Sequence, residues 1–158
     1  MSVQERLKDL GITLPRPAAP VANYVPYVIS GNLISISGQI PMGPDGPAYV
    51  GTVGAEVSVE DACKAARLCG INIIAQVKAA LDGDLDRVER IVKLGGFVHC
   101  IDGFSAQPQV INAASDLMVD VFGDAGRHSR SAVGTNALPL NVPVEIDALV
   151  AIKPVCKT

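Results

Sequence analysis

Residues 130–154 read RSAVGTNALPLNVPVEIDALVAIKP, and they contain two runs of small and β-branched residues separated by a segment with Asn and Pro. Such a pattern predicts two strands joined by a turn, the last hairpin of a sheet. Side chains alternate along a strand, so Val144 and Ile146 share one face and Glu145 and Asp147 share the other. The second strand thus has an apolar face for a core and a mixed face that begins with two carboxylates.

Arg130 opens this stretch among small residues, and its guanidinium stays charged at any working pH. Its fork of N–H donors fits a carboxylate through two hydrogen bonds, so an anion is expected close by. Two sources of that anion remain open: Glu145 or Asp147 on the paired strand, in an ordinary salt bridge, or a ligand. An arginine and a carboxylate lining one cleft could bind a small zwitterion or an acid derived from an amino acid.

Two helices are expected upstream. Ser58 and Asp61 form a capping box that starts a helix ending near Gly83, a strand covers residues 91–101, and residues 107–123 form the second helix. Each helix has a stripe of apolar residues at helical spacing, which predicts the side that faces the core. These stripes are Ala62, Ala66, Cys69, Ile73 and Val77 in the first helix, and Val110, Ile111, Ala114, Leu117, Met118 and Val121 in the second.

Residues 1–20 are expected to form a short helix followed by a proline-rich arm, and residues 21–158 a single domain. The domain begins with a hairpin over residues 27–40, and a short strand over residues 49–53 precedes the first long helix. The order of strands, helix, strand, helix and strands predicts an α+β fold, a mixed sheet with two main helices packed on one face. The other face then has nothing in the chain to cover it, which favours contact with further copies.

The composition narrows the classes of function. Of the 158 residues, 49% are apolar and only 18% charged, which also favours self-association. A net charge of -3 without a basic run argues against a surface that binds nucleic acid. The sequence has no apolar run long enough to cross a bilayer, so a cytoplasmic protein without membrane contact is expected.

The sequence contains none of the common catalytic motifs, and the spacing of its histidines and cysteines does not favour a metal site. His99 and His128 show no ligand spacing, and His128 is the better candidate for a catalytic role because it lies two residues before Arg130. The cysteines form no C-x-x-C pair and are interpreted as small apolar residues in a reducing compartment. They are Cys63, Cys69, Cys100 and Cys156.

Three segments together resemble the Rid family, also called the YjgF family, of enamine and imine deaminases. They are ANYVPYVISGN (22–32), GNLISISGQIP (31–41), and the closing pattern in which Arg130 is followed by LP and then by VPVEIDALV (142–150). The resemblance extends over nearly the whole domain. It implies a chorismate-mutase-like fold of the bacillus type and a homotrimer, with sheets that face a central core and three ligand clefts between subunits.

The resemblance also implies site residues. In the family a cleft arginine pairs with the substrate carboxylate, and its match is Arg130; the catalytic tyrosine and strand glutamate of the family fall on Tyr24 and Glu145. A packed residue of the arm is the alternative for Tyr24. The substrate-binding positions of the family fall on Ser37, Gly38, Ala132 and Asn112. A plain helix surface residue is the alternative for Asn112.

The activity implied is hydrolysis of 2-aminoacrylate and related enamines or imines to 2-keto acids and ammonia, with no metal or organic cofactor. The chain departs from the best-known branch at Ala132, where Cys is frequent, and at Gly134, where an acidic residue is frequent, so its substrate can differ. A non-catalytic protein that binds 2-keto acids in the same cleft is the alternative. The endoribonuclease activity sometimes attached to the family is disfavoured by the acidic charge.

Overall fold

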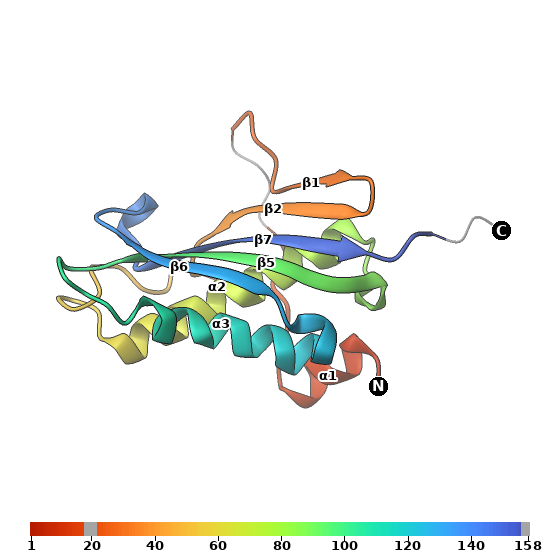
Figure 1. The fold of residues 1–158 in the computed structure, drawn as a ribbon, viewed down its shortest axis with the longest axis horizontal. Coiled ribbons are helices and arrows are strands. Elements are labelled where there is room, and N and C mark those ends of the chain that lie inside the picture. Colours follow the sequence, from red (N-terminus) through yellow and green to blue (C-terminus); the bar gives the residue numbers. More distant parts are fainter. Residues whose placement is uncertain (18–21, 156–158) are drawn as a thin grey trace.

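The computed structural model describes residues 1–17 and 22–155 (Figure 1). Its helices are α1 (Val3–Asp9), α2 (Val59–Ala80) and α3 (Gln107–Phe122), with short 3-10 turns η1 (Leu85–Arg87), η2 (Gly123–Gly126) and η3 (Pro139–Asn141). Its strands are β1 (Tyr27–Ser30), β2 (Leu33–Gln39), β3 (Met42–Gly43), β4 (Gly46–Pro47), β5 (Val88–His99), β6 (Ser129–Thr135) and β7 (Val144–Ile152). The main sheet has the order β1-β2-β7-β5-β6, and β3 pairs only with β4.

The main sheet is mixed, as predicted. Strands β5 and β6 run parallel with α3 as their crossover, and the other pairs are antiparallel. The prediction of a closing hairpin is wrong, because β5 lies between β6 and β7. Phe97 of β5 is opposite Val133 on one side and Glu145 on the other. The Pro- and Asn-containing segment therefore spans a whole strand instead of making a tight turn.

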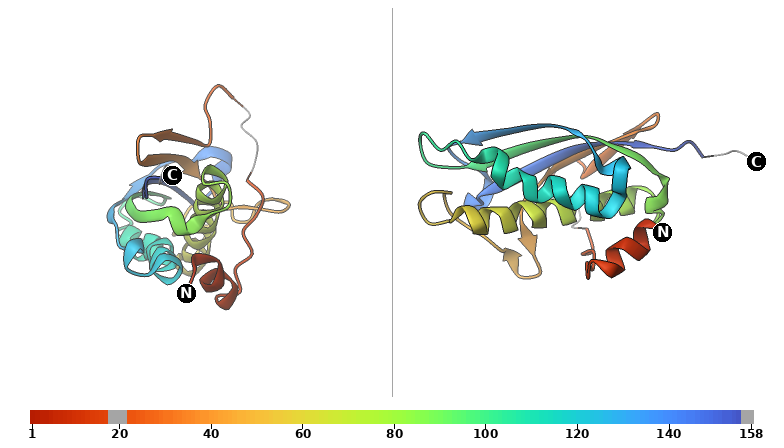
Figure 2. Two further views of the ribbon diagram at one scale, coloured as in Figure 1. Left: turned by 90° about the vertical axis from the view of Figure 1, so that its right-hand side faces the viewer. Right: turned by 60° about the horizontal axis from the view of Figure 1, so that its bottom comes forward.

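Helices α2 and α3 lie side by side on one face of the sheet (Figure 2). Every residue of the two predicted apolar stripes is buried, and so are Val144, Ile146 and Val150 on the inner face of β7. The helices approach closely at Gly70, where a methyl group would come within 2.9 Å of Leu117 Cδ2. The small residues of α2 thus allow a dense helix-on-sheet core.

A local signal in the sequence explains where α2 begins. The Ser58 hydroxyl accepts a hydrogen bond from the Asp61 N–H at 3.1 Å, which confirms the predicted start of α2.

The expected strand over residues 49–53 is wrong, since this segment contributes only an isolated bridge at Val53. Gly51 has a φ of +124°, a conformation that turns the chain away from an extended path.

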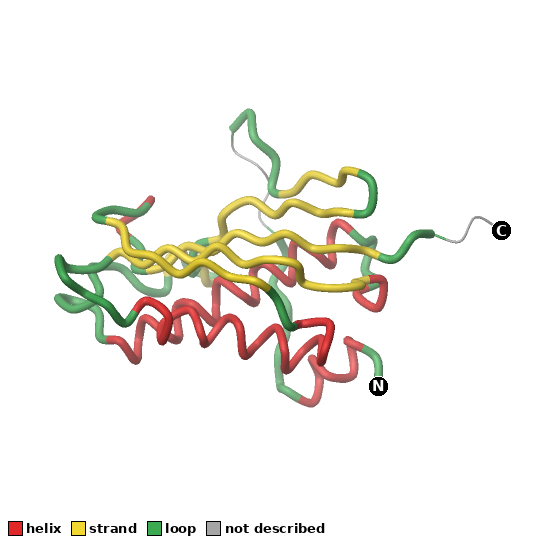
Figure 3. Tube along the Cα trace, in the orientation of Figure 1, coloured by secondary structure: helices red, strands yellow, loops and turns green. Residues whose placement is uncertain are grey.

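The second face of the sheet carries none of the helices in the described part of the chain (Figure 3). Val28, Leu33, Phe97 and Val133 are exposed, large apolar side chains of β1, β2, β5 and β6. Strand register and alternation place all four on this open face together with the carboxylates of β7. Among the described helices, none is both long and apolar enough to span a bilayer.

Candidate functional site

Arg130 extends from β6, the edge strand, toward the helices. It is in register with Leu94 of β5, which in turn faces Ala148 of β7, and both of these side chains are buried under the helices. Neighbouring residues of a sheet in register share a face. Arg130 therefore lies on the helix side, at the free edge of the sheet.

Helix α3 holds the guanidinium through neutral partners. Arg130 Nη1 donates to Asn112 Oδ1 at 2.8 Å and to Ser115 Oγ at 3.1 Å, and Nη2 donates to the Pro108 carbonyl at 3.5 Å. Asn112, which the resemblance assigned to substrate binding, is thus a partner of Arg130. Asn112 is also exposed on α3, so its alternative, a helix surface residue, is not contradicted.

His128 extends this network. Its Nδ1 lies 2.6 Å from the Gly126 carbonyl, which can only accept, so Nδ1 carries the proton. Nε2 then accepts from the Ser115 hydroxyl at 2.9 Å, and the hydroxyl oxygen accepts in turn from Arg130. We call Arg130, Asn112, Ser115 and His128 the Arg130 cluster. It fixes the position of a cation with hydrogen bonds only.

The positive charge of Arg130 has no counterion within the described chain. The ion pairs there involve Lys64, Arg90 and Arg127, and none involves Arg130. The alternative of a salt bridge to Glu145 or Asp147 is wrong for this chain. Two Nη1–H groups and one Nη2–H group have partners, which leaves donors of the guanidinium for an anion.

Glu145 lies on the opposite face of the sheet, where it belongs to a second group of predicted residues. Its carboxylate covers Gly38, and a methyl group at that position would collide with Glu145 Oε1. Ser37 donates from Oγ to the Val25 carbonyl at 2.7 Å and so ties down the segment just after Tyr24, whose side chain is 61% exposed. We call Glu145, Gly38, Ser37 and Tyr24 the Glu145 cluster.

The environment of Glu145 favours its protonated form. Partial burial raises the pKa of this carboxyl group above its ordinary value, and the neighbouring charge of Asp147 raises the pKa further. Asp147 lies over Gly95 in the same way that Glu145 lies over Gly38. A glycine on the adjacent strand thus makes room for each of the two carboxylates in the middle of β7. This pair of glycines is how the fold accommodates two acidic side chains side by side on one strand.

The structure brings the predicted residues together in two sets, not one. Arg130, Asn112 and Ala132 lie on the helix side near β6, whereas the Glu145 cluster lies on the open face near β2 and β7. Strands β6 and β7 are separated by β5, a distance of roughly 10 Å across the sheet. One chain therefore cannot hold a small molecule between Arg130 and Glu145.

One member of the Arg130 cluster, Ser115, was missed in the sequence. Ser115 lies three residues after Asn112, so both occupy one side of α3, and this spacing together with an arginine on the next strand was the available signal. His128 was singled out only for its proximity to Arg130 in the sequence. Its contact with Ser115 depends on η2, which returns the chain along α3 before β6 begins.

The cysteines show no sign of a reactive or bridging role in the described chain. Cys69 is fully buried, and burial raises the pKa of its thiol well above the ordinary value. Cys63 and Cys100 are partly buried and free. Cys156 lies outside the described residues. The interpretation of small apolar residues is confirmed for Cys69.

Comparison with known proteins places this arrangement in a family. Over residues 4–151 the chain matches the family model described as YjgF/chorismate mutase-like, putative endoribonuclease. Protein TCP17 of Trypanosoma cruzi is 48% identical over 149 residues, which cover 94% of this chain and 92% of that protein.

Solved structures give the same result. The protein Atu1372 of Agrobacterium tumefaciens, described as of unknown function, has a TM-score of 0.90 and 52% identity over 96% of this chain and 92% of that chain. A putative endoribonuclease of Shewanella oneidensis has a TM-score of 0.92 and 35% identity over 96% of this chain and 100% of that chain. The fold is thus the α+β fold of the YjgF/chorismate-mutase-like class. The chain belongs to the YjgF family, also called the Rid family.

Proposed function

We propose that the protein hydrolyses reactive enamines and imines, such as 2-aminoacrylate, to 2-keto acids and ammonia in the cytoplasm. Arg130 carries the proposal, because it is a fixed cation at a free sheet edge whose partners in the described chain are all neutral. A site that presents guanidinium donors without a protein anion is suited to the carboxylate of a small acid. Neither a metal nor a cofactor is part of the proposal.

The residues of the two clusters supply the groups that this reaction needs. Arg130 would bind the substrate carboxylate, and the enamine would tautomerise to an imine with a C=N bond. Glu145 would remove a proton from water as the water oxygen bonds to the imine carbon, and would return this proton to the nitrogen as the nitrogen takes up the C=N electron pair. The resulting carbinolamine would expel ammonia and leave the 2-keto acid. The raised pKa of Glu145 suits this proton transfer.

The complete site would be shared between copies of the chain. Arg130 and Glu145 lie on opposite faces here, and β6 is a free edge beside an uncovered sheet face. In a closed homotrimer, the Arg130 cluster of one copy would meet the Glu145 cluster of the next. Tyr24 and the backbone at Ser37 and Gly38 would line the cleft. Ala132 would border it on the Arg130 side.

The word endoribonuclease in the names of the family and of the Shewanella protein describes a different reaction. RNA binding relies on Lys and Arg side chains that neutralise phosphates. This chain has 13 Lys and Arg against 16 Asp and Glu, and a net charge of -3. The charge therefore supports the small-acid reaction over cleavage of RNA.

The deciding experiment generates 2-aminoacrylate and bulkier 2-imino acids in situ with a lyase or an oxidase and follows their decay. The wild-type protein should accelerate decay and release ammonia, and Arg130→Ala should lower kcat/KM by about 100-fold or more, because a charged pair to the substrate is lost. Arg127→Ala, a change in an exposed arginine nearby, is the matched control. Binding of 2-keto acids without any acceleration would instead assign the cleft to a binding protein.

A further inference from the structure

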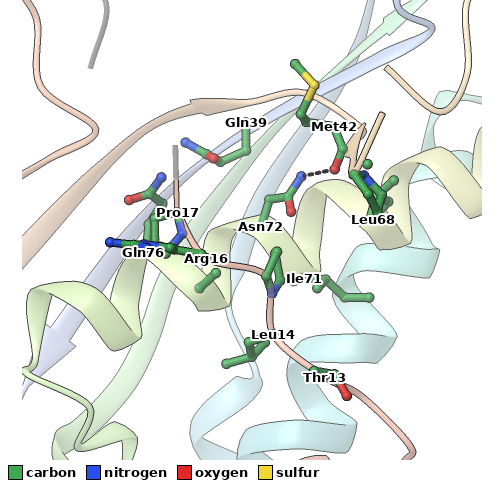
Figure 4. Close-up of a pocket in the computed structure, with 14 residues that line it drawn as sticks. Thr13, Leu14, Arg16, Pro17, Gln39, Met42, Leu68, Ile71, Asn72 and Gln76 are labelled. Carbon is green, nitrogen blue, oxygen red and sulfur yellow. Dashed lines mark hydrogen bonds between the residues drawn. The ribbon is translucent and has the colours of Figure 1, made fainter. Parts of the chain in front are cut away.

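A pocket lies between the N-terminal arm and α2 (Figure 4). Its volume is about 640 Å³, within the range of pockets that hold small molecules. Leu14 of the arm and Leu68, Ile71 and Ala75 of α2 form an apolar part. None of the residues of the Arg130 or Glu145 cluster lines it.

Gln76 is a polar residue of the pocket lining, and its side-chain oxygen has no hydrogen-bond partner in the described chain. The side chain is only 4% exposed. A buried acceptor without a partner is costly, so such atoms are rare in native proteins. Oε1 is enclosed as the side chain stands, so a half-turn of the amide about its last bond would present this acceptor to a ligand with an N–H donor.

In two further amide side chains of the pocket, the nitrogen atom already donates hydrogen bonds to backbone carbonyls. Asn72 Nδ2 donates to the carbonyls of Ile40 and Met42 at 3.0 and 3.2 Å, and Gln39 Nε2 donates to the Ser37 carbonyl at 3.0 Å. These bonds fix which end of each amide is nitrogen, and they leave the two side-chain oxygens as acceptors. Together with Gln76 Oε1, the pocket lining offers three amide oxygens.

Arg16 adds a positive charge beside these acceptors. It is an exposed residue of the arm that lines the pocket, and Figure 4 draws Arg16, Gln39 and Gln76 at one end and Leu14, Leu68 and Ile71 toward the other. A guanidinium matches a carboxylate, three amide oxygens match an ammonium group, and the apolar part matches a hydrocarbon side chain.

From this pattern we infer that the pocket between the arm and α2 binds an apolar α-amino acid. The ammonium group donates to Gln76 Oε1, the carboxylate faces Arg16, and the hydrocarbon side chain lies against Leu68 and Ile71. The ligand bridges the arm and α2, so its binding also fastens the arm to the domain. This site is independent of the proposed deaminase cleft, and either assignment can fail alone.

Calorimetric titration of the full-length protein tests the site with three probes. L-Leucine carries both charged groups, 4-methylpentanoate lacks the ammonium group, and leucinamide lacks the carboxylate. Leucine should bind about 10- to 100-fold more tightly than 4-methylpentanoate, because a hydrogen bond to a charged donor is lost with the amine. Leucinamide should also bind more weakly.

The variant Gln76→Met keeps the side-chain volume but removes the acceptor. It should lower the affinity for leucine about tenfold and leave that for 4-methylpentanoate unchanged. Gln109→Met, a change at an exposed glutamine of α3, and Arg130→Ala should bind leucine like the wild type. No leucine binding by the wild type, equal binding by Gln76→Met, or loss of binding in Arg130→Ala would each overturn the inference.

A measurement without any variant covers the case in which Gln76→Met does not fold. In a methyl NMR titration of the wild type, leucine should shift the signals of Leu68 and Ile71 and leave that of Val133 on the open face unchanged. Shifts confined to Val133 would contradict the assignment.

Discussion

The Arg130 cluster and the Glu145 cluster occupy opposite faces of one sheet, and they are built by different means. Three hydrogen bonds connect Arg130, Asn112, Ser115 and His128, and two more join Arg130 and His128 to backbone carbonyls. Glu145 is positioned mainly by shape, because its carboxylate fills the space left by Gly38. The cation is thus held rigidly before any ligand arrives, whereas the carboxylate keeps freedom to move.

This difference suits their proposed roles. A binding cation gains from a fixed position, since little order must be imposed when the substrate carboxylate arrives. A group that transfers protons must reach two places, the attacking water and the leaving nitrogen. If the proposed function holds, assembly of copies and not folding of one chain would complete the site, because the two clusters are separate.

The largest effect is expected from mixing two inactive variants. Arg130→Ala and Glu145→Gln each remove one half of the proposed cleft, so each protein alone should be nearly inactive. After unfolding and refolding together in equal amounts, about a quarter of the sites in a closed ring would pair an intact arginine with an intact glutamate from the next copy. Activity should therefore return to about a quarter of the wild-type rate.

The control is each variant refolded alone, with the size of the assembly checked by sedimentation. A mixture that forms mixed trimers yet stays as inactive as its parents would show that both groups serve a site within one chain. A monomer by sedimentation would also contradict the shared cleft.

Glu145 is expected to control the pH profile of the reaction. Its ionised form places the water, so kcat/KM should rise with pH through a pKa above the ordinary glutamate value of 4.5. Asp147→Asn removes the neighbouring charge and should move this limb to lower pH. Glu145→Gln should lower kcat by about 100-fold and flatten the limb. A limb that stays in place in Asp147→Asn would contradict the coupling.

The same raised pKa has a consequence for stability. Folding favours the protonated carboxyl group, so the stability linked to Glu145 is present at low pH and is lost as pH rises through the raised pKa. Glu145→Gln should therefore be more stable than the wild type at neutral pH. At a pH below the pKa of an ordinary glutamate carboxyl group, the two proteins should be equally stable. The gain should be small because Glu145 is only half-buried.

A pair of glycine variants separates an effect on the proposed site from an effect on the core. In Gly38→Ala the new methyl group meets only the end of the Glu145 side chain, which can swing aside. Activity should fall about tenfold with little change in melting temperature, because a misplaced catalytic group costs rate. In Gly96→Ala the methyl group comes within 2.6 Å of Ile111 Cγ1 in the core, so stability should fall by about 1 to 3 kcal/mol. Equal melting temperatures for the two variants would contradict this contrast.

The fold was largely predictable because its signals are local. The apolar stripes of α2 and α3 and the Ser58 cap identify the helices, and alternation along β7 separates Ile146 from Glu145. Strand neighbours were not predictable in the same way. Residues 130–154 look like a hairpin, but the pairing of β5 with both β6 and β7 depends on the crossover through α3.

The topology also decides between the two sources of an anion that the sequence left open for Arg130. A hairpin could have placed Glu145 or Asp147 beside it. In the structure β5 lies between them, and the register of Arg130 with Leu94 and Ala148 puts the two carboxylates on the other face. The resemblance identified residues of both clusters, but only tertiary contacts show that they are separate. The only sequence signal for Ser115 is its spacing of three residues from Asn112, and its contact with Arg130 is seen only in the folded structure.

The smallest effect is expected from Ser115→Ala, which tests whether the Arg130 cluster is as rigid as its hydrogen bonds suggest. The change removes one neutral partner of Arg130 and the link to His128, while the bond to Asn112 remains. KM should rise about 3- to 10-fold with kcat nearly unchanged, because one hydrogen bond that orients the cation is lost and the charge stays. Ser105→Ala, at an exposed serine before α3, is the control. A fall in kcat instead of a rise in KM would mean that His128 and Ser115 act on the reaction itself, and the fixed cation would then be only part of what this side of the sheet supplies.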